Sequence, residues 1–395
     1  MQTKKKFQTG NVLSIASTHM LHDIYSSFLA PLRPLLIEKF QMTMLLSSLL
    51  DIFQRTPNLF NPLVGLLADK APARYFIIVT PAITAITMSL LGAAPYYSVL
   101  AILLFVMGIS GALFHVPSPV MIKKVSGNRI GKGMSFYMLG GEIARTLGPL
   151  IITGAVSLWG LEGTWRLIPF GLVASFILYF KLRKIKISDD LHKRKDNDGA
   201  GKTFKKLRPF FFSLLGVIFF RAIAKSALTG FLPTYFVVEE SKSLWYGSIA
   251  LAILQTAGAI GTYISGTISD KIGRTTTLMI SAIAVPIIMW GFIMSNSYYT
   301  LAMLFLLGFF IFAQGPVVLA LIQDIKTERP AFVNGIYMTI NFLSSSIAIL
   351  IAGWFGDIFS LAVTFKITAT ASLLAIPFIL ILSKNNKSKI FNSNK

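Results

Sequence analysis

The chain has 395 residues, of which 54% are hydrophobic and only 13% are charged, and its mean hydropathy is +0.68. A soluble domain carries about 25% charged residues, so this composition excludes a soluble enzyme and indicates a membrane protein. The absence of cysteine excludes disulfides, thiolate zinc sites and catalytic thiols. The net charge of +21 would suggest a nucleic-acid partner in a soluble protein. Membrane proteins instead gather basic residues in cytoplasmic loops, so we expect no nucleic-acid partner.

Twelve segments are apolar enough to cross a bilayer as helices, because a spanning helix needs about 20 largely apolar residues. In chain order these spans are 10–36, 43–67, 75–93, 97–122, 133–158, 164–182, 209–237, 244–268, 276–294, 298–323, 332–355 and 360–383. Pro31, Pro34 and Pro233 interrupt the first and seventh spans, which is tolerated where neighbouring helices satisfy the freed backbone groups. The sequence therefore predicts an all-α membrane protein with 12 transmembrane helices.

Basic residues lie almost entirely on one side of the predicted spans. The two chain ends and every second loop hold 28 of the 37 Lys and Arg residues, whereas the opposite loops hold three: Lys39, Arg166 and Lys242. Loops rich in Lys and Arg stay in the cytoplasm. We therefore expect a multi-pass protein of the bacterial inner (plasma) membrane with both termini in the cytoplasm.

A long polar segment from Lys181 to Arg208 divides six spans from six. We expect an N-terminal six-helix bundle at 1–182, a cytoplasmic linker at 183–208 and a C-terminal six-helix bundle at 209–395. We also expect a monomer whose partners are the lipid bilayer, protons and a small-molecule substrate.

One loop occurs twice. Gly65-Leu-Leu-Ala-Asp69-Lys70-Ala-Pro-Ala-Arg74 follows the second span, and Gly266-Thr-Ile-Ser-Asp270-Lys271-Ile-Gly273-Arg274 follows the eighth span, with Gly and Asp offset by 201 residues. Parallel halves related by an axis along the membrane normal are typical of transporters with a substrate site near the midplane.

These loops resemble the signature Gly-x-Leu-x-Asp-Lys/Arg-x-Gly-Arg of the major facilitator superfamily, although the first copy has Ala-Pro in place of the x-Gly step. The resemblance covers nearly the whole chain and implies two pseudo-symmetric six-helix bundles that work by alternating access. It also implies that the loop residues latch the cytoplasmic gate: Gly65, Asp69, Lys70, Arg74, Gly266, Asp270, Lys271, Gly273 and Arg274.

A narrower resemblance is to the fosmidomycin-resistance branch of that superfamily. It rests on three stretches: Thr18-His19-Met-Leu-His22-Asp23, Phe114-His115-x-Pro117 and Gly140-Gly141…Leu147-Gly148-Pro149-Leu150. The branch implies proton-driven export of small, often anionic compounds. Its substrate is not carried over, because four charged residues depart from the pattern: Glu142, Arg145, Asp51 and Arg55.

Ionisable side chains at membrane depth are costly and normally face a cavity or one another. Three acids lie at that depth: Asp23, Asp51 and Glu142. Four bases and three histidines join them: Arg55, Arg145, Arg221, Lys225, His19, His22 and His115. Arg33 and Lys366 lie near a helix end or break, from which we expect their side chains to reach the interface.

His19 and Asp23 are i, i+4 neighbours on one helix face, and so are Arg221 and Lys225, at an offset of 202 residues. In the fold of the resembled family, spans one and seven line equivalent parts of the central cavity. We therefore expect an acidic and imidazole face to oppose a dibasic face. An interdomain salt bridge that closes one gate is the alternative interpretation.

Asp23 is the predicted principal proton carrier, with Glu142 as the second carrier and His19 as a relay. A low-dielectric cavity favours a protonated carboxyl group, and an approaching cation favours release of the proton. Histidine titrates near neutral pH. Glu142 could instead form a structural pair with Arg145 or Arg55, and Asp51 and Arg55 could neutralise each other.

The deep bases outnumber the deep acids, which predicts an anionic or zwitterionic substrate. Arg221 and Lys225 suit a carboxylate, phosphate or phosphonate, since Arg offers a bidentate fork. The predicted substrate site also includes Arg145, Arg55, His115, Gln255, Gln314 and Tyr25.

We therefore predict a proton-coupled secondary transporter, an exporter (antiporter) of a small compound or drug, with no cofactor and no enzymatic activity. An importer or a carrier of a divalent metal or metal chelate is the alternative within transport. Imidazoles and a carboxylate suit transition metals, and the possible ligands are His19, His22, Asp23 and His115. The alternative of another class is a membrane-embedded metal-dependent enzyme, although an enzyme needs no duplicated gate loop.

Overall fold

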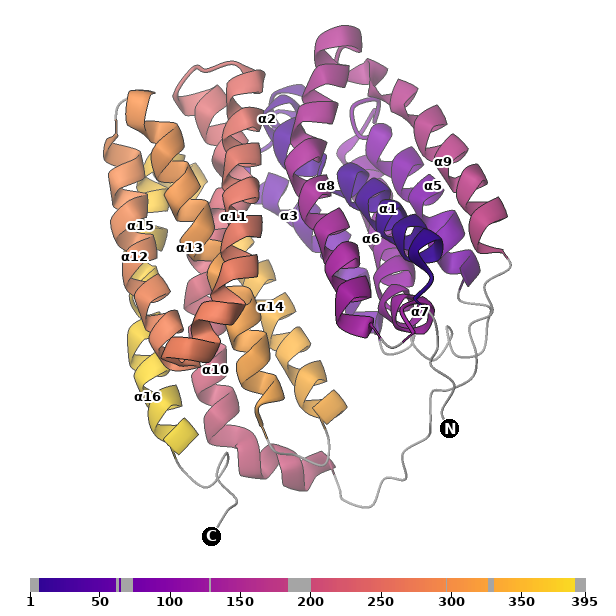
Figure 1. The fold of residues 1–395 in the computed structure, drawn as a ribbon. Coiled ribbons are helices and arrows are strands. Elements are labelled where there is room, and N and C mark those ends of the chain that lie inside the picture. Colours follow the sequence, from indigo (N-terminus) through magenta and orange to yellow (C-terminus); the bar gives the residue numbers. More distant parts are fainter. Residues whose placement is uncertain are drawn as a thin grey trace, which may run out of the picture. The chain divides into compact units, whose positions relative to one another are not determined.

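The computed structural model describes residues 7–61, 64, 74–127, 129–183, 200–295, 297–325 and 330–387, and the chain is helical almost throughout these residues (Figure 1). The first half of the chain forms α1 (Thr9–Ser26), α2 (Leu29–Phe40), α3 (Met44–Arg55), η1 (Thr56–Phe60), α5 (Arg74–Ser89), α6 (Tyr97–His115), α7 (Ser118–Val125), α8 (Ile130–Trp159), η2 (Glu162–Leu167) and α9 (Ile168–Leu182). The second half forms α10 (Ala200–Thr234), the π-helical η3 (Tyr235–Glu239), α11 (Leu244–Ile272), α12 (Arg274–Met294), α13 (Ser297–Gln323), α14 (Pro330–Ile358), α15 (Leu361–Ser372) and α16 (Ala375–Lys387).

Eight helical segments among the described residues are long and apolar enough to cross a membrane: Tyr97–Val125, Glu162–Leu182, Phe204–Glu239, Leu244–Ile272, Arg274–Met294, Tyr299–Ile322, Val333–Ile358 and Leu361–Lys384. The other four predicted spans are also helical but are broken, short or more polar. The first divides into α1 and α2 just before Pro31 and Pro34, which lack the backbone N–H that an unbroken helix needs. The second forms α3 and η1 in its described part, which leaves out residues 62, 63 and 65–67. Helix α5 has 16 residues, and α8 carries three charged side chains, Lys132, Glu142 and Arg145.

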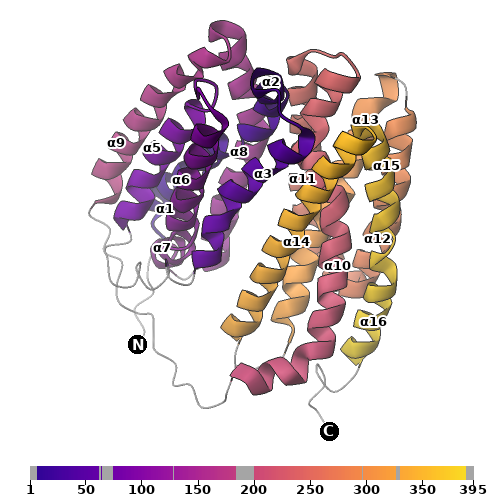
Figure 2. The same ribbon diagram turned by 180° about the vertical axis from the view of Figure 1, so that it is seen from behind.

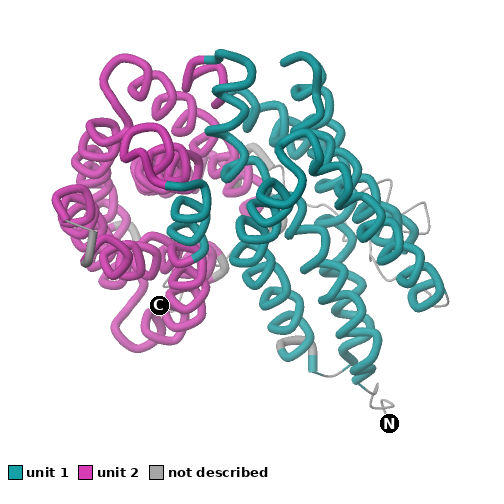
Figure 3. Tube along the Cα trace, turned by 90° about the horizontal axis from the view of Figure 1, so that it is seen from above, with its two compact units in different colours: residues 1–42, 49–193, 243–252 teal, residues 43–48, 194–242, 253–395 magenta. Residues whose placement is uncertain are grey.

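The helices form two compact units, shown in teal and magenta in Figure 3. Unit 1 consists of residues 1–42, 49–193 and 243–252, and unit 2 consists of the rest of the chain. Within unit 1, α1 lies along α8, and within unit 2, α10 lies along α14 (Figures 1 and 2). The predicted linker overlaps α10, which begins at Ala200, and its residues 184–199 lie outside the described residues. The division into domains at this linker therefore stays a prediction.

Each unit also contains the start of one helix from the other half of the sequence. The start of α3, within residues 43–48, belongs to unit 2, and the start of α11, within residues 243–252, belongs to unit 1. In unit 2, the Asp357 carboxylate accepts hydrogen bonds from the backbone N–H groups of Met44 (2.6 Å) and Leu45 (2.9 Å) at the start of α3. In unit 1, Trp245 of α11 donates its indole N–H to Ser157 Oγ of α8 (2.9 Å). The carboxylate satisfies free donors at a helix N-terminus, where a negative charge is stabilising.

Arg33 does not reach the interface, which corrects the expectation drawn from its position near a helix break. Its side chain is only 1% exposed, and its guanidinium pairs with Asp51 of α3. The other oxygen of Asp51 lies 3.6 Å from Arg55 Nη2, so the predicted pair of Asp51 and Arg55 is present with Arg33 as a third member. Because α2 restarts at Leu29, after the break, it directs Arg33 towards α3.

Removing the charge of Asp51 is expected to destabilise the protein, because Arg33 would remain buried without a counter-charge. We expect Asp51→Asn to cost about 3–5 kcal/mol, measured as a lower unfolding midpoint of the purified protein in detergent. The double variant Arg33→Met with Asp51→Leu removes both charges and is expected to recover most of the loss. Glu162→Gln breaks an exposed pair with Lys39 (2.8 Å) and should leave the midpoint unchanged. Equal midpoints for Asp51→Asn and Glu162→Gln would contradict this account.

Candidate functional site

The carboxylate of Asp23 in α1 lies among three imidazole rings of unit 1. His19 Nε2 lies 3.3 Å from Asp23 Oδ2, His22 Nδ1 lies 3.1 Å from Oδ1, and His115 Nε2 of α6 lies 3.3 Å from Oδ1. The pairing of His19 with Asp23, which their spacing on one helix predicts, is thus present in the structure. His19, His22 and Asp23 are buried, whereas 45% of the His115 side chain is exposed.

Glycines of α8 allow this helix to approach the cluster closely. A Cβ atom at Gly141 would lie 2.7 Å from His19 Cε1 and 3.0 Å from His19 Nε2, which is closer than van der Waals contact allows. A Cβ atom at Gly148 would lie 2.7 Å from the backbone oxygen of Ile24. Glycine at these two positions therefore lets α8 pack directly on the face of α1 that carries His19 and Asp23.

The hydrogen bonds of His19 require an additional proton in the cluster. His19 Nδ1 lies 2.7 Å from the backbone oxygen of Tyr137, and a carbonyl can only accept, so Nδ1 carries a hydrogen. With a neutral ring and an ionised Asp23, lone pairs would face each other between His19 Nε2 and Asp23 Oδ2. The pair therefore needs one more proton, either on the imidazole or on the carboxyl group. Both groups are able to carry it.

His22 has a different role from His19. Its ring stacks on Phe114 with centroids 4.6 Å apart, and its buried Nε2 has no hydrogen-bond partner among the described residues. A charged ring would bury an N–H group without an acceptor, which is costly. We infer that His22 stays neutral and donates from Nδ1 to Asp23. His115 is the exposed member of the cluster.

The second deep acid of unit 1, Glu142, pairs with Arg145 one turn further along α8. Arg145 Nη1 donates to Glu142 Oε1 at 2.9 Å, so the structural pair that the sequence suggested is present. Glu142 Oε2 is buried and has no hydrogen-bond partner among the described residues. The role of Glu142 as a second proton carrier stays a prediction.

The two deep bases of unit 2 lie one turn apart on α10. Arg221 is 8% exposed, and its Nη2 donates to Asn341 Oδ1 of α14 at 3.2 Å. Lys225 Nζ lies 4.4 Å from the centroid of the Phe312 ring, within the range of a cation–π interaction. Since Asp23 belongs to unit 1 and Arg221 to unit 2, the expected opposition of their two helix faces stays a prediction.

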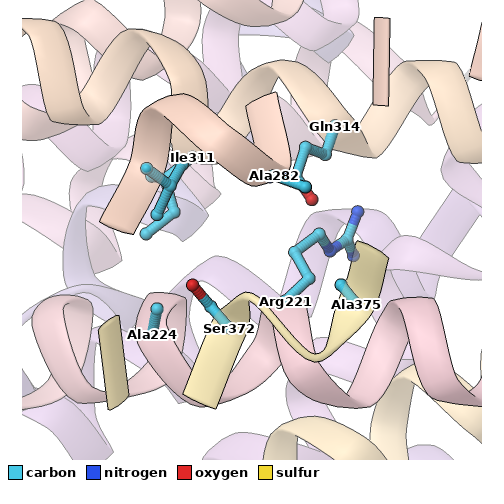
Figure 4. Close-up of a pocket in the computed structure, with 8 residues that line it drawn as sticks. Arg221, Ala224, Ala282, Ile311, Gln314, Ser372 and Ala375 are labelled. Atoms are coloured by element: carbon cyan, nitrogen blue, oxygen red, sulfur yellow. The ribbon is translucent and has the colours of Figure 1, made fainter. Parts of the chain in front are cut away.

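Three uncharged candidates for the substrate site have specific surroundings. Gln314 of α13 is buried and lines a small cavity together with Arg221 (Figure 4). Gln255 of α11 has a buried Oε1 with no hydrogen-bond partner in the described part of the chain. Tyr25 donates its hydroxyl to the backbone oxygen of Leu167 at 2.8 Å, which ties α1 to η2. Their contact with a substrate stays a prediction.

Residues 15–349 match the family model of the Major Facilitator Superfamily. The chain belongs to this superfamily. It is 22% identical to the fosmidomycin resistance protein of Escherichia coli (strain K12) over 388 residues, which cover 98% of this chain and 96% of that protein. It is 27% identical to a probable nitrate/nitrite antiporter of Thermus thermophilus over 237 residues, which cover 55% of this chain and 51% of the relative. The crystal structure of a D-xylose-proton symporter has the same fold, with a TM-score of 0.76 at 13% identity over 95% of this chain and 97% of that one.

Membership in the superfamily makes the protein a multi-pass membrane transporter that takes a small-molecule substrate. The predicted fold class and the predicted resemblance to the fosmidomycin-resistance branch are confirmed. The prediction that the protein is not an enzyme is also confirmed, so the alternative of a membrane-embedded enzyme is set aside.

The repeated loop of this transporter is described in its second copy only, since Gly65, Asp69 and Lys70 lie outside the described residues and Arg74 opens α5. In the second copy, Arg274 pairs with Asp270 and also lies 3.3 Å, Nε to Oδ2, from Asp324 at the end of α13. Gly273 has a φ of 94°, a conformation that favours glycine, and it turns the chain from α11 into α12. Gly266 and Lys271 lie on α11, before this turn. The contacts join α11, α12 and α13 at one end, and their action as a gate stays a prediction.

The transporter could also hold a divalent cation in unit 1. Single donor atoms of His19, Asp23 and His115 lie within 4.8 Å of one another. A metal-bound imidazole commonly donates its other N–H to a backbone carbonyl, as His19 does to Tyr137. His22, which the sequence also suggested, is outside this group.

The protonation states inferred for the transporter can be measured directly. In the purified protein with ¹⁵N-labelled histidine, we expect His22 to be neutral at neutral pH with its hydrogen on Nδ1, and we expect His19 to carry a hydrogen on Nδ1. Single His→Ala variants assign the signals, since the chain has four histidines. A charged His22, or a His19 without hydrogen on Nδ1, would contradict the arrangement.

Proposed function

We propose that the protein is a proton-coupled exporter that moves a small anionic or zwitterionic compound out of the cell by antiport and alternating access. The superfamily supplies the transport function. Efflux is supported by the Escherichia coli relative, which covers nearly the whole chain and is named for resistance to a drug. The basic side of the predicted topology supports a plasma-membrane location with both termini in the cytoplasm.

The observation that carries the proton coupling is the proton that His19 and Asp23 must share. One proton on this pair leaves it neutral overall, which suits a low-dielectric site. Loss or gain of a proton would leave a net charge there, which is costly unless water or an opposite charge approaches. His115 has an exposed ring in contact with Asp23, so it offers a path for exchange when the cluster meets water. A change in water access can therefore load or release the proton.

Asp23 differs from the other deep acids in its neighbours. Asp51 lies between two permanently charged guanidinium groups, those of Arg33 and Arg55. Glu142 pairs with one guanidinium group, although its second oxygen is without a partner. The ion-pair partners that the structure gives Asp23 are all imidazoles, whose rings, unlike a guanidinium group, can be either neutral or charged. We therefore assign Asp23 as the principal carrier, His19 as its relay and Glu142 as a second carrier.

The distribution of charge supports an anionic substrate. Arg33 is buried, so it counts as a deep base of unit 1. The three deep acids of this unit are then matched by three deep bases, which are Arg33, Arg55 and Arg145. Unit 2 contributes Arg221 and Lys225, and α10 contains no acid to offset them. An excess of positive charge in a low-dielectric environment attracts anions. The relative from Thermus thermophilus, which is named for nitrate and nitrite, supports the same class of substrate.

The proton-carrier role is tested by Asp23→Asn, with Glu38→Gln at an exposed position of α2 as the matched control. A thermal-shift screen of anionic metabolites, phosphonates, metal chelates and lipophilic drugs first provides a substrate. In proteoliposomes, we expect Asp23→Asn to lose transport driven by a pH gradient while substrate exchange without a gradient survives. Glu38→Gln should retain both activities.

Undiminished gradient-driven transport by Asp23→Asn would refute the carrier role. Metal analysis of the purified protein addresses the remaining alternative within transport. One tightly held divalent ion per chain would favour a metal carrier that uses His19, Asp23 and His115.

The anion preference is tested by Lys225→Gln. Loss of a charge-assisted hydrogen bond costs about 1.5–3 kcal/mol, so we expect anionic compounds to bind roughly 10- to 150-fold more weakly. Neutral compounds from the same screen should bind as before. Lys366→Gln is the control. It removes a cation of α15 that lies 5.7 Å from the centroid of the Trp290 ring, and it should change neither affinity. Equal losses for anionic and neutral compounds would count against an anionic substrate.

A further inference from the structure

Arg221 lies in the middle of its membrane span. The span runs from Phe204 to Glu239, so Arg221 is 17 residues from one end and 18 from the other. A helix rises 1.5 Å per residue, so each end is about 25 Å away along the axis. This is farther than an arginine side chain can reach, and only 8% of Arg221 is exposed. Its charge therefore stays inside unit 2.

The structure gives Arg221 only uncharged partners. Its Nη2 donates to Asn341 at 3.2 Å, and it also hydrogen-bonds to the side chain of Tyr337, on the same helix as Asn341. Its Nε is buried and has no hydrogen-bond partner among the described residues. An amide and a phenol orient the guanidinium group, but neither neutralises its charge.

The surrounding helices contain no carboxylate that could approach Arg221. Helices α10, α12, α13, α15 and α16 have no Asp or Glu in their sequences. The acid of α14, Asp357, is 16 residues beyond Asn341, which is about 24 Å along the helix, and it binds the start of α3. Lys225, one turn along α10, adds a second positive charge. A buried cation without a counter-ion is strongly unfavourable, and the described helices of unit 2 bring no carboxylate close to Arg221.

A cavity of suitable size lies beside the guanidinium group. Figure 4 shows the side chains of Arg221 and Gln314 extending into the same space, which Ser372 and small or apolar residues of the surrounding helices also line. The volume open to the centre of a water molecule is about 10 Å³, which is room for one particle of that size. An organic substrate does not fit into this volume, whereas a single monatomic anion comparable in size to a water molecule does.

We propose that this cavity is a binding site for a small monovalent inorganic anion, of the size of chloride, held by Arg221 and Gln314. The anion is the counter-ion that lets α10 carry a guanidinium group at the middle of the membrane. This inference goes beyond the proposed function, because it depends on neither the proton cluster nor the transported compound. Of the two bases of α10, the proposal assigns Arg221 to the small anion.

The site is tested by the thermal stability of the purified transporter at constant ionic strength, with gluconate exchanged stepwise for chloride or bromide. Gluconate is too large for the cavity, so we expect the midpoint to rise by a few degrees and to saturate with the halides only. Arg221→Gln should remove this dependence. Gln314→Leu leaves the charge of Arg221 in place and should weaken halide binding. This variant tests the site if Arg221→Gln does not fold. Lys225→Gln should retain a saturable rise.

Three outcomes would overturn the proposal. They are a midpoint that does not depend on halide, equal stabilisation by gluconate, and equal loss of the dependence in Lys225→Gln and Arg221→Gln. A midpoint unaffected by halide would mean that a water molecule alone fills the cavity. Asp23→Asn should keep the halide dependence, so failure of the proton proposal and failure of the anion site are distinguishable.

Discussion

A charge in the low-dielectric interior of a membrane protein requires a compensating partner, and this requirement governs the arrangement of the described helices. In unit 1 each deep acid has a partner of opposite or titratable charge. Arg33 and Arg55 flank Asp51, Arg145 pairs with Glu142, and imidazoles surround Asp23. The kind of partner then decides whether a carboxylate can exchange a proton or is held ionised for structural reasons.

We propose Asp23 as the carboxylate that exchanges a proton. A guanidinium group keeps its charge at any physiological pH, whereas an imidazole gains or loses a proton near neutrality. The carbonyl of Tyr137 fixes which nitrogen of His19 bears hydrogen, and this turns a simple contact with Asp23 into a pair that needs a shared proton. The neutral His22 supports the carboxylate from the other side, and the exposed ring of His115 gives access.

Unit 2 meets the same physical requirement in the opposite way. Helices α10, α12 and α13 contain no acid, and we propose that a bound anion compensates the charge of Arg221. The cavity that Arg221 and Gln314 line has room for about one particle of the size of water, and Lys225 lies on the Phe312 ring. We therefore propose that unit 1 exchanges protons through its own carboxylate and that unit 2 attracts anions through its buried bases.

The sequence by itself determined the helical membrane fold, the gathering of basic residues in alternate loops and the pairing of His19 with Asp23, because composition and the spacing of 3.6 residues per turn specify neighbours along one helix. It misplaced Arg33, which a helix break turns towards Asp51. Only the tertiary structure decided that His115 and the Tyr137 carbonyl complete the Asp23 cluster and that Arg221 lines a cavity with Gln314. Those contacts join different helices, and their geometry depends on how closely the helices pack, which glycines such as Gly141 permit but no periodicity encodes.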